Sequence, residues 1–228
     1  MFKKSLLAVS VAALAAVAPL ANAYETGDFV IRAGIVTVQP HEDSGHIAAG
    51  PLGKVGGSKA TVDHDEELGL TFSYFFTDHL AVELLGATPF KHKVGYKGLG
   101  GAGLPNSKLA DIKELPPTLS LVYYPLQKDY PVQPYVGLGI NYTHFFDEDL
   151  SSDAKSKGFH GLDLDDSWGA AAEVGADWRL TDRLFINTQV RYIDIDTTAK
   201  AHLDGVGRVK VDVDVDPWVY MVALGYKF

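Results

Sequence analysis

The sequence predicts an all-β fold, because large apolar side chains recur at every second position in eight separate segments. The clearest is the C-terminal segment 218–228, in which every even position from Trp218 to Phe228 is apolar and four of these are aromatic. The connections between these eight segments alternate between short turns and long polar stretches. After the N-terminal residues, no run of about 18 apolar residues is available to form a membrane-spanning helix. Together these features are typical of an eight-stranded antiparallel transmembrane β-barrel of the bacterial outer membrane.

The first 23 residues read as a secretory signal peptide. Lys3 and Lys4 precede an apolar run, and Ala21-Asn22-Ala23 provides a small-residue cleavage site. We therefore predict that residues 1–23 are removed and that 24–228 form a single barrel domain. The even strand number predicts that both chain ends lie on the periplasmic side of the outer membrane.

Composition excludes several classes of function. The chain has a formal net charge of −9, which becomes more negative once Lys3 and Lys4 are removed, and it has no sustained Lys/Arg cluster, so nucleic acid is not a predicted partner. It contains no cysteine, which rules out disulfides and thiol chemistry. The mean hydropathy of +0.02 is near zero, as expected where apolar and polar positions alternate.

The eight predicted strands are separated by two kinds of connection. They cover 29–35, 68–76, 80–90, 118–123, 136–143, 168–180, 184–196 and 218–228. Tight turns are expected at 77–79, 125–131 and 181–183. The segments 41–65, 91–111 and 147–166 lack alternation, and we expect exposed loops there.

Aromatic residues mark the two edges of the predicted lipid-facing band. Trp168 and Trp178 stand ten residues apart on one strand, which at ~3.3 Å per residue spans about 33 Å and, when tilted, covers the apolar band of a barrel. With Trp218 they predict an aromatic girdle. The terminal strand resembles the closing strand of outer-membrane barrels, in which a C-terminal Phe, here Phe228, is the signal read by the barrel-assembly machinery.

Six charged residues are predicted to point into the barrel near the short turns: Arg32, Glu83, Glu173, Asp177, Arg179 and Arg191. Eight strands enclose an interior only wide enough for side chains. We therefore expect opposite charges to pair and to close this end of the lumen as a charged floor. A purely structural set of core ion pairs is the alternative, and it is compatible with a solute that leaves by another route.

Above this floor the inward positions become apolar: Val36, Val38, Leu85, Ala87 and Pro89. Burial of apolar surface stabilises by about 25 cal/mol per Å². An apolar lumen open to water therefore predicts a docking site for an apolar solute. Plain packing of these side chains is the alternative.

Proline interrupts two neighbouring predicted strands at comparable heights, at Pro89 on one and at Pro116 and Pro117 on the other. Because proline cannot donate a hydrogen bond to the ladder, facing prolines predict a lateral opening in the barrel wall. A bulge without function is the alternative.

Acidic residues gather in two runs: Asp163, Asp165 and Asp166, and Asp212, Asp214 and Asp216. Neither run fits the template of a calcium-binding loop. We favour a solvated acidic strand extension, and we predict no metal and no cofactor. Three of the eight histidines share the first long loop and are interpreted as scattered polar residues.

An enzyme is a weaker hypothesis. His144 and Ser167 lie near the predicted outer rim on adjacent strands, but no nucleophile-elbow motif accompanies them. We therefore predict that the protein is not an enzyme.

A family resemblance covers the mature chain. It is carried by Gly27-Asp28-Phe29, Ile31-Arg32-Ala33-Gly34, Val82-Glu83-Leu84-Leu85, Ala87-Thr88-Pro89-Phe90-Lys91-His92-Lys93, Leu115-Pro116-Pro117-Thr118-Leu119, Pro134-Tyr135-Val136-Gly137, Gly139-Ile140-Asn141-Tyr142-Thr143 and the end from Asp216 to Phe228. With these stretches the chain resembles the outer-membrane protein W family.

The resemblance implies a monomeric barrel for passive uptake of small, mainly hydrophobic molecules, surrounded by outer-membrane lipid and lipopolysaccharide. It leaves small amino acids open as substrates. A structural or receptor barrel, whose long loops bind phage, toxin or host, is the alternative from a different class.

Overall fold

The computed structural model describes residues 24–41, 43–49, 53–99, 106–127 and 129–228, so the predicted signal peptide lies outside the described residues. Eight antiparallel strands form the barrel: β1 (Phe29–Gln39), β5 (Asp65–Phe75), β6 (Leu80–Ala87), β9 (Thr118–Tyr123), β10 (Val132–Leu150), β12 (Ser167–Arg179), β13 (Leu184–Ile193) and β16 (Trp218–Lys227). Each strand pairs with the next, and β1 pairs with β16, so the ring is closed. The predicted all-β barrel is confirmed.

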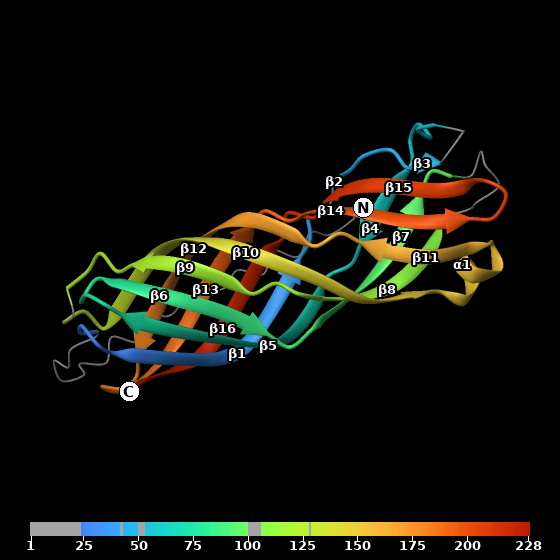
Figure 1. Ribbon diagram of the computed structural model, residues 1–228. Coiled ribbons are helices and arrows are strands. Elements are labelled where there is room, and N and C mark those ends of the chain that lie inside the picture. The colour runs from blue at the N-terminus through green and yellow to red at the C-terminus, as the bar shows by residue number, and fades with distance from the viewer. Residues whose placement is uncertain (1–23, 42, 50–52, 100–105, 128) are drawn as a thin grey trace, which may run out of the picture.

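The strands continue beyond one end of the barrel as an extension (Figure 1). One sheet of this extension joins the end of β10 to β8 (Ser107–Leu115), β7 (Phe90–Lys97) and β4 (Lys59–Val62). The other contains β11 (Phe159–Leu164), β14 (Asp196–Leu203), β15 (Gly207–Asp214) and the short strands β2 (Asp43–Ser44) and β3 (Ala48–Ala49). We call this end the extension end, and the end with the short turns the turn end.

The segments expected to be exposed loops contain much of this extension, so that expectation was wrong. Two features hid the strands. His92 and Glu114 face inward, which removes the apolar alternation from β7 and β8. Bulges also shift the phase, between Val94 and Gly95 and between His160 and Asp163. β6 also ends earlier than predicted, at Ala87 rather than at Phe90, because Pro89 has no N–H to donate to the ladder.

A single five-residue helix, α1 (Ser152–Ser156), is found in the described residues and connects β10 to β11. Its N-cap is Ser151, whose hydroxyl accepts a hydrogen bond from the backbone N–H of Ala154 at 3.0 Å. Nowhere in the described part of the chain is there a helix long and apolar enough to cross a membrane.

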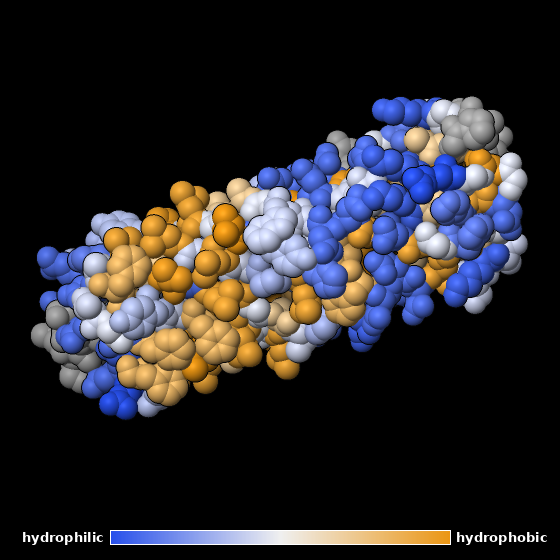
Figure 2. Space-filling model, in the orientation of Figure 1, coloured by the Kyte–Doolittle hydropathy of each residue, from blue (hydrophilic) through white to orange (hydrophobic). Residues whose placement is uncertain are grey.

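The outer surface of the barrel is apolar. On β5, for example, Leu70, Phe72 and Tyr74 are exposed, while the alternating side chains Thr71 and Ser73 are buried. The face shown in Figure 2 carries an apolar region over the barrel, with hydrophilic residues at the turn end and over the extension. An exposed apolar surface of this extent requires an apolar environment, because monomeric soluble proteins rarely expose apolar patches beyond a few hundred Å².

Candidate functional site

Arg32 lies fully buried inside the barrel, and its guanidinium donates hydrogen bonds in several directions. Nη1 donates to Glu83 Oε2 at 2.8 Å and to Ser73 Oγ at 2.7 Å. Nε and Nη2 donate to the two carboxylate oxygens of Asp177 at 3.1 and 2.8 Å, and Nη2 also donates to the Tyr124 hydroxyl at 2.8 Å. Because β1, β6 and β12 supply the charged groups, the cluster links strands that are not neighbours in the ring.

Arg191 extends this cluster. Its Nη2 donates to Glu83 Oε1 at 3.0 Å and to Glu173 Oε2 at 2.5 Å, so Glu83 bridges the two arginines. These buried charges pair with one another and with polar neighbours, as buried charges require. Arg179, also predicted for the floor, is half-buried and donates to the backbone carbonyl of Tyr130 in a short turn.

Aromatic rings fill the barrel beside the charged cluster at the turn end. Tyr24 stacks on Phe75 with ring centroids 4.2 Å apart and lies edge-on to Tyr124 at 5.1 Å. The Tyr24 hydroxyl donates to Asp177 Oδ2 at 2.6 Å. Tyr24 is not predictable from the sequence, because a lone aromatic residue ahead of the first strand carries no periodicity.

The lumen above the floor is apolar. Val36, Val38 and Leu85 are buried in one hydrophobic cluster, and Ala87 packs against it. Pro89 is half-buried and is not a member of this cluster. The same cluster includes side chains of β7, β8, β11, β14 and β15, so the apolar interior of the barrel continues into the extension.

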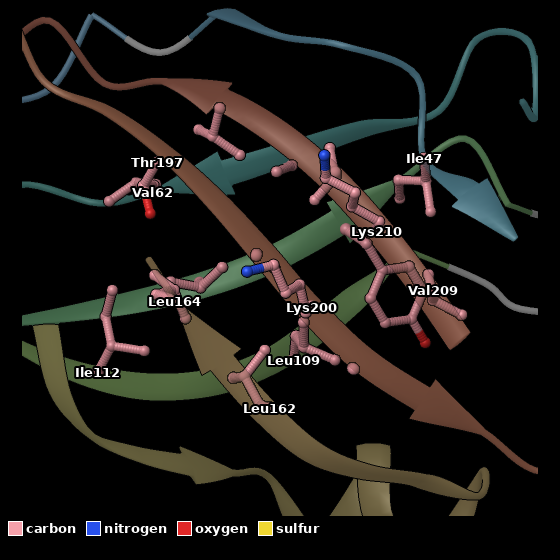
Figure 3. Close-up of a pocket in the computed structure, with 18 of the residues that line it drawn as sticks. Ile47, Val62, Leu109, Ile112, Leu162, Leu164, Thr197, Lys200, Val209 and Lys210 are labelled. Atoms are coloured by element: carbon pink, nitrogen blue, oxygen red, sulfur yellow. The ribbon is translucent and has the colours of Figure 1, made fainter. Parts of the chain in front are cut away.

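A cavity of ≈ 70 Å³ lies within the extension. Strands of both sheets line it, and Ile112, Leu162 and Leu164 are among the side chains that surround it in Figure 3. A cavity of about 150 Å³ holds benzene. Because the cavity has about half that volume, an apolar solute of this size requires the lining side chains to move apart.

The barrel wall is interrupted directly below this cavity. Pairing between β6 and β9 ends at Leu85 and Thr118, and pairing between β7 and β8 begins at Phe90 and Glu114. The three prolines that predict a lateral opening all lie in the segments between these pairs: Pro89, Pro116 and Pro117.

Among the described residues, the segment with Pro116 and Pro117 lacks a hydrogen-bonded neighbour on only one of its two edges. Asn141 on β10 donates from Nδ2 to the carbonyls of Pro116 and Pro117 at 3.1 and 3.2 Å, and the N–H of Tyr142 donates to Pro117 at 3.1 Å. On the far side of the gap, Thr88 N–H donates to Leu68 of β5 at 2.9 Å. Each segment is therefore held by its outer neighbour, and the gap lies between the two.

The three tryptophans face outward, as the alternation predicts. Trp168 and Trp178 lie at opposite ends of β12, and Trp218 lies beside Tyr192 at the extension end, with ring centroids 5.5 Å apart. At the turn end Phe228 is 63 % exposed, and its N–H donates to the Phe29 carbonyl at 2.9 Å, which fastens the chain terminus to β1.

The barrel, its aromatic edges and its extension can be compared with known proteins. A model of the protein family described as OmpW matches residues 25–228. The chain belongs to the OmpW family. Outer membrane protein W of Vibrio cholerae is 40% identical to it, covering 99% of this chain and 100% of that protein, and the Escherichia coli protein of the same name is 43% identical over 96% and 99%. The protein is accordingly an outer-membrane protein surrounded by lipid.

Solved structures agree. The crystal structure of OprG from Pseudomonas aeruginosa superposes with a TM-score of 0.86 at 52% identity, covering 90% of this chain and 98% of that one. The structure of AlkL in lipid bilayers has a TM-score of 0.59 at 23% identity and shares the fold. The side of the membrane on which the termini lie stays a prediction.

The two acidic runs considered from the sequence do not converge in this OmpW-family barrel. Asp165 pairs with Lys200, and Asp212 pairs with Lys210 at 3.2 Å. Asp166 is bound by the Tyr142 hydroxyl at 2.5 Å. The hydrogen bond from Tyr142 holds the pKa of Asp166 below the ordinary range of an aspartate, and hydrogen bonds from Thr198 and Lys210 lower the pKa of Asp212 in the same way.

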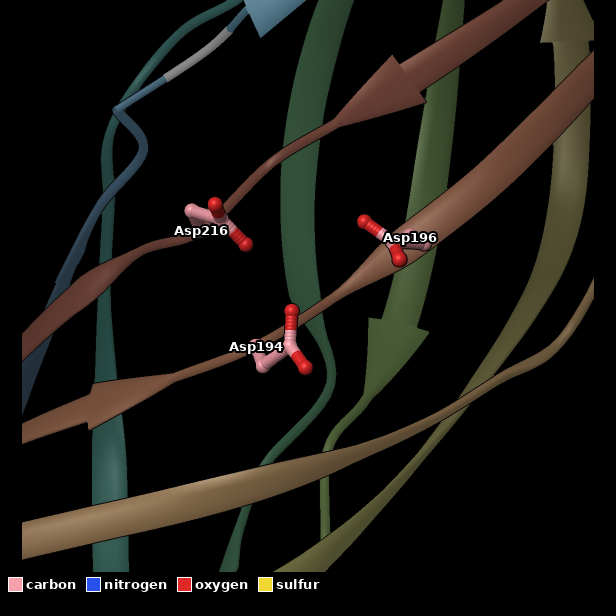
Figure 4. A group of neighbouring side chains, drawn as sticks. All are labelled: Asp194, Asp196 and Asp216. Carbon is pink, nitrogen blue, oxygen red and sulfur yellow. The ribbon is translucent and has the colours of Figure 1, made fainter.

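A different acidic group forms where β13, β14 and β16 meet: the carboxylates of Asp194, Asp196 and Asp216 offer oxygens within 4.8 Å of one another (Figure 4). Burial and the neighbouring carboxylates raise the pKa of Asp196. Asp216 Oδ1 accepts the Ile195 N–H at 3.3 Å, which gives this residue a structural role in the strand crossing. The expected absence of a metal stays a prediction.

His144 and Ser167 do not form a catalytic pair in the OmpW-family barrel. His144 is exposed and its Nδ1 contacts Asp166 Oδ1 at 2.9 Å. Ser167 is buried, and its hydroxyl accepts the Asp196 N–H at 3.0 Å. The two side chains thus point to opposite faces of the wall.

Proposed function

We propose that the protein mediates passive uptake of small, mainly hydrophobic molecules, which enter the apolar cavity of the extension and leave sideways through the interrupted wall into the outer leaflet. The observation that carries the proposal is the order of features along the barrel. A charged floor comes first, an apolar lumen lies above it, and the gap in the wall opens at the level of this lumen. A solute that dissolves in the apolar interior meets buried ions in the axial direction, and moving it past them requires their network to open.

The lateral route is also favoured by the bonding at the gap. Thr88 N–H points to β5, so the usual alternation of an antiparallel strand directs the nitrogen of residue 89 toward the β8–β9 side, where a proline has no proton to donate. Substrate chemistry is supported by a relative from Pseudomonas aeruginosa named dibenzothiophene metabolism operon protein PahQ, which is 32% identical over 77% of the chain. Dibenzothiophene is an apolar aromatic molecule.

The test is Pro89→Val, which restores an N–H at the gap. Uptake of a hydrophobic probe by liposomes containing this variant should fall several-fold, while folding of the barrel is unchanged. Pro134→Val, on β10 near the turn end, is the matched control and should transport like the wild type.

An axial route gives the opposite result. If Arg32→Ala combined with Glu83→Ala raises ion conductance and solute uptake together, while Pro89→Val transports normally, the solute passes through the floor and the lateral proposal is wrong. Uptake equal to that of protein-free liposomes, for hydrophobic probes and small amino acids alike, favours a receptor barrel instead.

A further inference from the structure

Two ionisable side chains are buried in the wall of the apolar cavity, His92 on β7 and Glu114 on β8. Their side chains are 2% and 3% exposed, and His92 Nε2 lies 3.3 Å from Glu114 Oε1. Burying polar groups in an apolar wall is costly unless they are paired. Packing alone gives no reason for a carboxylate at this position, because β8 also supplies Leu109 and Ile112 to the same wall.

The hydrogen-bond pattern defines which atoms of the pair are committed. His92 Nδ1 lies 2.7 Å from the backbone carbonyl of Asp63, and a carbonyl only accepts, so Nδ1 carries a proton. Nε2 and Glu114 Oε1 then need one further proton between them. Burial lowers the pKa of His92, but its hydrogen bond to Glu114 and the charge of that carboxylate outweigh burial and raise it, which favours an imidazolium.

The second oxygen of the Glu114 carboxylate has no such partner in the described part of the chain. Glu114 Oε2 accepts no hydrogen bond from any residue that the structure describes. The other polar side chains of the lining are engaged elsewhere: Thr197 Oγ1 donates to the Asp165 carbonyl at 2.6 Å, Lys200 is paired with the Asp165 carboxylate, Lys210 lies 3.2 Å from Asp212, and the Tyr96 hydroxyl accepts from Lys157 at 3.4 Å.

We propose that Glu114 Oε2 accepts a hydrogen bond from the solute, so that the cavity selects small apolar molecules that carry one donor, such as a hydroxyl group, over hydrocarbons of the same shape. This inference rests on the proposed function and specifies its substrate class. A mostly apolar pocket with a single well-placed polar group is the usual arrangement for orienting a small ligand. Because a buried acceptor is left unpaired by a ligand without a donor, such sites discriminate strongly.

Glu114 also lies close to the proposed exit. It pairs with Phe90 in the first registered pair above the wall interruption, and Leu115 and Pro116 follow it directly. A solute bound through its hydroxyl group is therefore held with its apolar body beside the proposed exit.

The test compares p-cresol with p-xylene, which differ by a hydroxyl in place of a methyl group. Binding is measured by equilibrium dialysis on the protein in liposomes, with protein-free liposomes of the same lipid as reference, because both probes dissolve in lipid. The wild type should bind p-cresol about tenfold more tightly than p-xylene, as expected for one hydrogen bond to a charged acceptor.

Two variants isolate the carboxylate. His92→Phe combined with Glu114→Leu removes the pair together, so that no buried charge is left alone, and should abolish the preference while p-xylene still binds. Asp111→Asn changes an exposed carboxylate on the outer face of the same strand and should keep the preference.

The outcomes separate the two proposals. Equal binding of both probes to the wild type, or a preference retained by the double variant, overturns the role of Glu114 and leaves uptake of hydrophobic molecules standing. Failure of the wild type to bind either probe overturns both.

Discussion

Replacing Arg32 by methionine should destabilise the barrel more than any single change at its surface. The side chain is fully buried, and the change removes its hydrogen bonds to Glu83, Asp177, Ser73 and Tyr124. Breaking a buried ion pair from one side costs about 3–5 kcal/mol, because the partner is left as an uncompensated charge.

The remaining partners set the upper limit of this loss. Glu83 keeps Arg191 at 3.0 Å, and Asp177 keeps the Asn187 amide at 2.8 Å and the Tyr24 hydroxyl at 2.6 Å. Neither carboxylate loses every partner, so we expect a decrease in the free energy of unfolding within that range of about 3–5 kcal/mol rather than above it.

Urea unfolding of the purified barrel in lipid, followed by tryptophan fluorescence, measures this change. Arg208→Met is the matched control, because Arg208 is exposed on β15, and it should cost below about 1 kcal/mol. If the two variants unfold at the same urea concentration, the buried network does not stabilise the barrel and the reasoning fails.

Three further predictions follow from the fold. His92 has a raised pKa, so its stabilisation of the extension is complete below the unfolded pKa of about 6.5 and is lost as pH rises through the folded value. Protease cleavage of the extension should increase over that window in the wild type, and this increase should be lost when His92→Phe is combined with Glu114→Leu, which leaves no buried charge unpaired. An epitope inserted at Gly205 should be accessible on intact cells and one at Asp182 should not, and the reverse pattern would falsify the orientation. Gly34→Ala should impair closure, because its Cβ would lie 2.1 Å from a backbone oxygen of β16, whereas Gly86→Ala, with no atom within 4 Å, should fold normally. Electrophoresis that separates folded from unfolded protein measures both variants.

Much of the barrel could be predicted because one physical constraint acts on every strand. Lipid outside and a narrow lumen inside impose a period of two, and β12 shows it from Trp168 to Trp178. The extension obeys no such constraint, because its outer face is in water. There the inward His92 and Glu114 and the bulge at Gly95 removed the signal that alternation provides.

The candidate site was predictable in part. The alternation of side chains along a strand places Arg32, Glu83 and Asp177 inside, but it does not show which charges meet. Tyr24 was missed because its position depends on a tertiary contact with Phe75. The His92–Glu114 pair was missed because its partners come together only through the register of β7 and β8.

The seam between β1 and β16 has a consequence for biogenesis. Ten residue pairs, from Val30–Lys227 to Gln39–Trp218, join the first barrel strand to the last. Contacts between opposite ends of a chain form slowly, because the entropy of closing the loop is lost before the contacts are made. Until β16 has been synthesised and exported, β1 has an unpaired edge and β13 has another, and such edges associate with other chains. Closure of the barrel therefore waits for β16, and a chain that lacks residues 218–228 has two unpaired edges instead of a closed barrel.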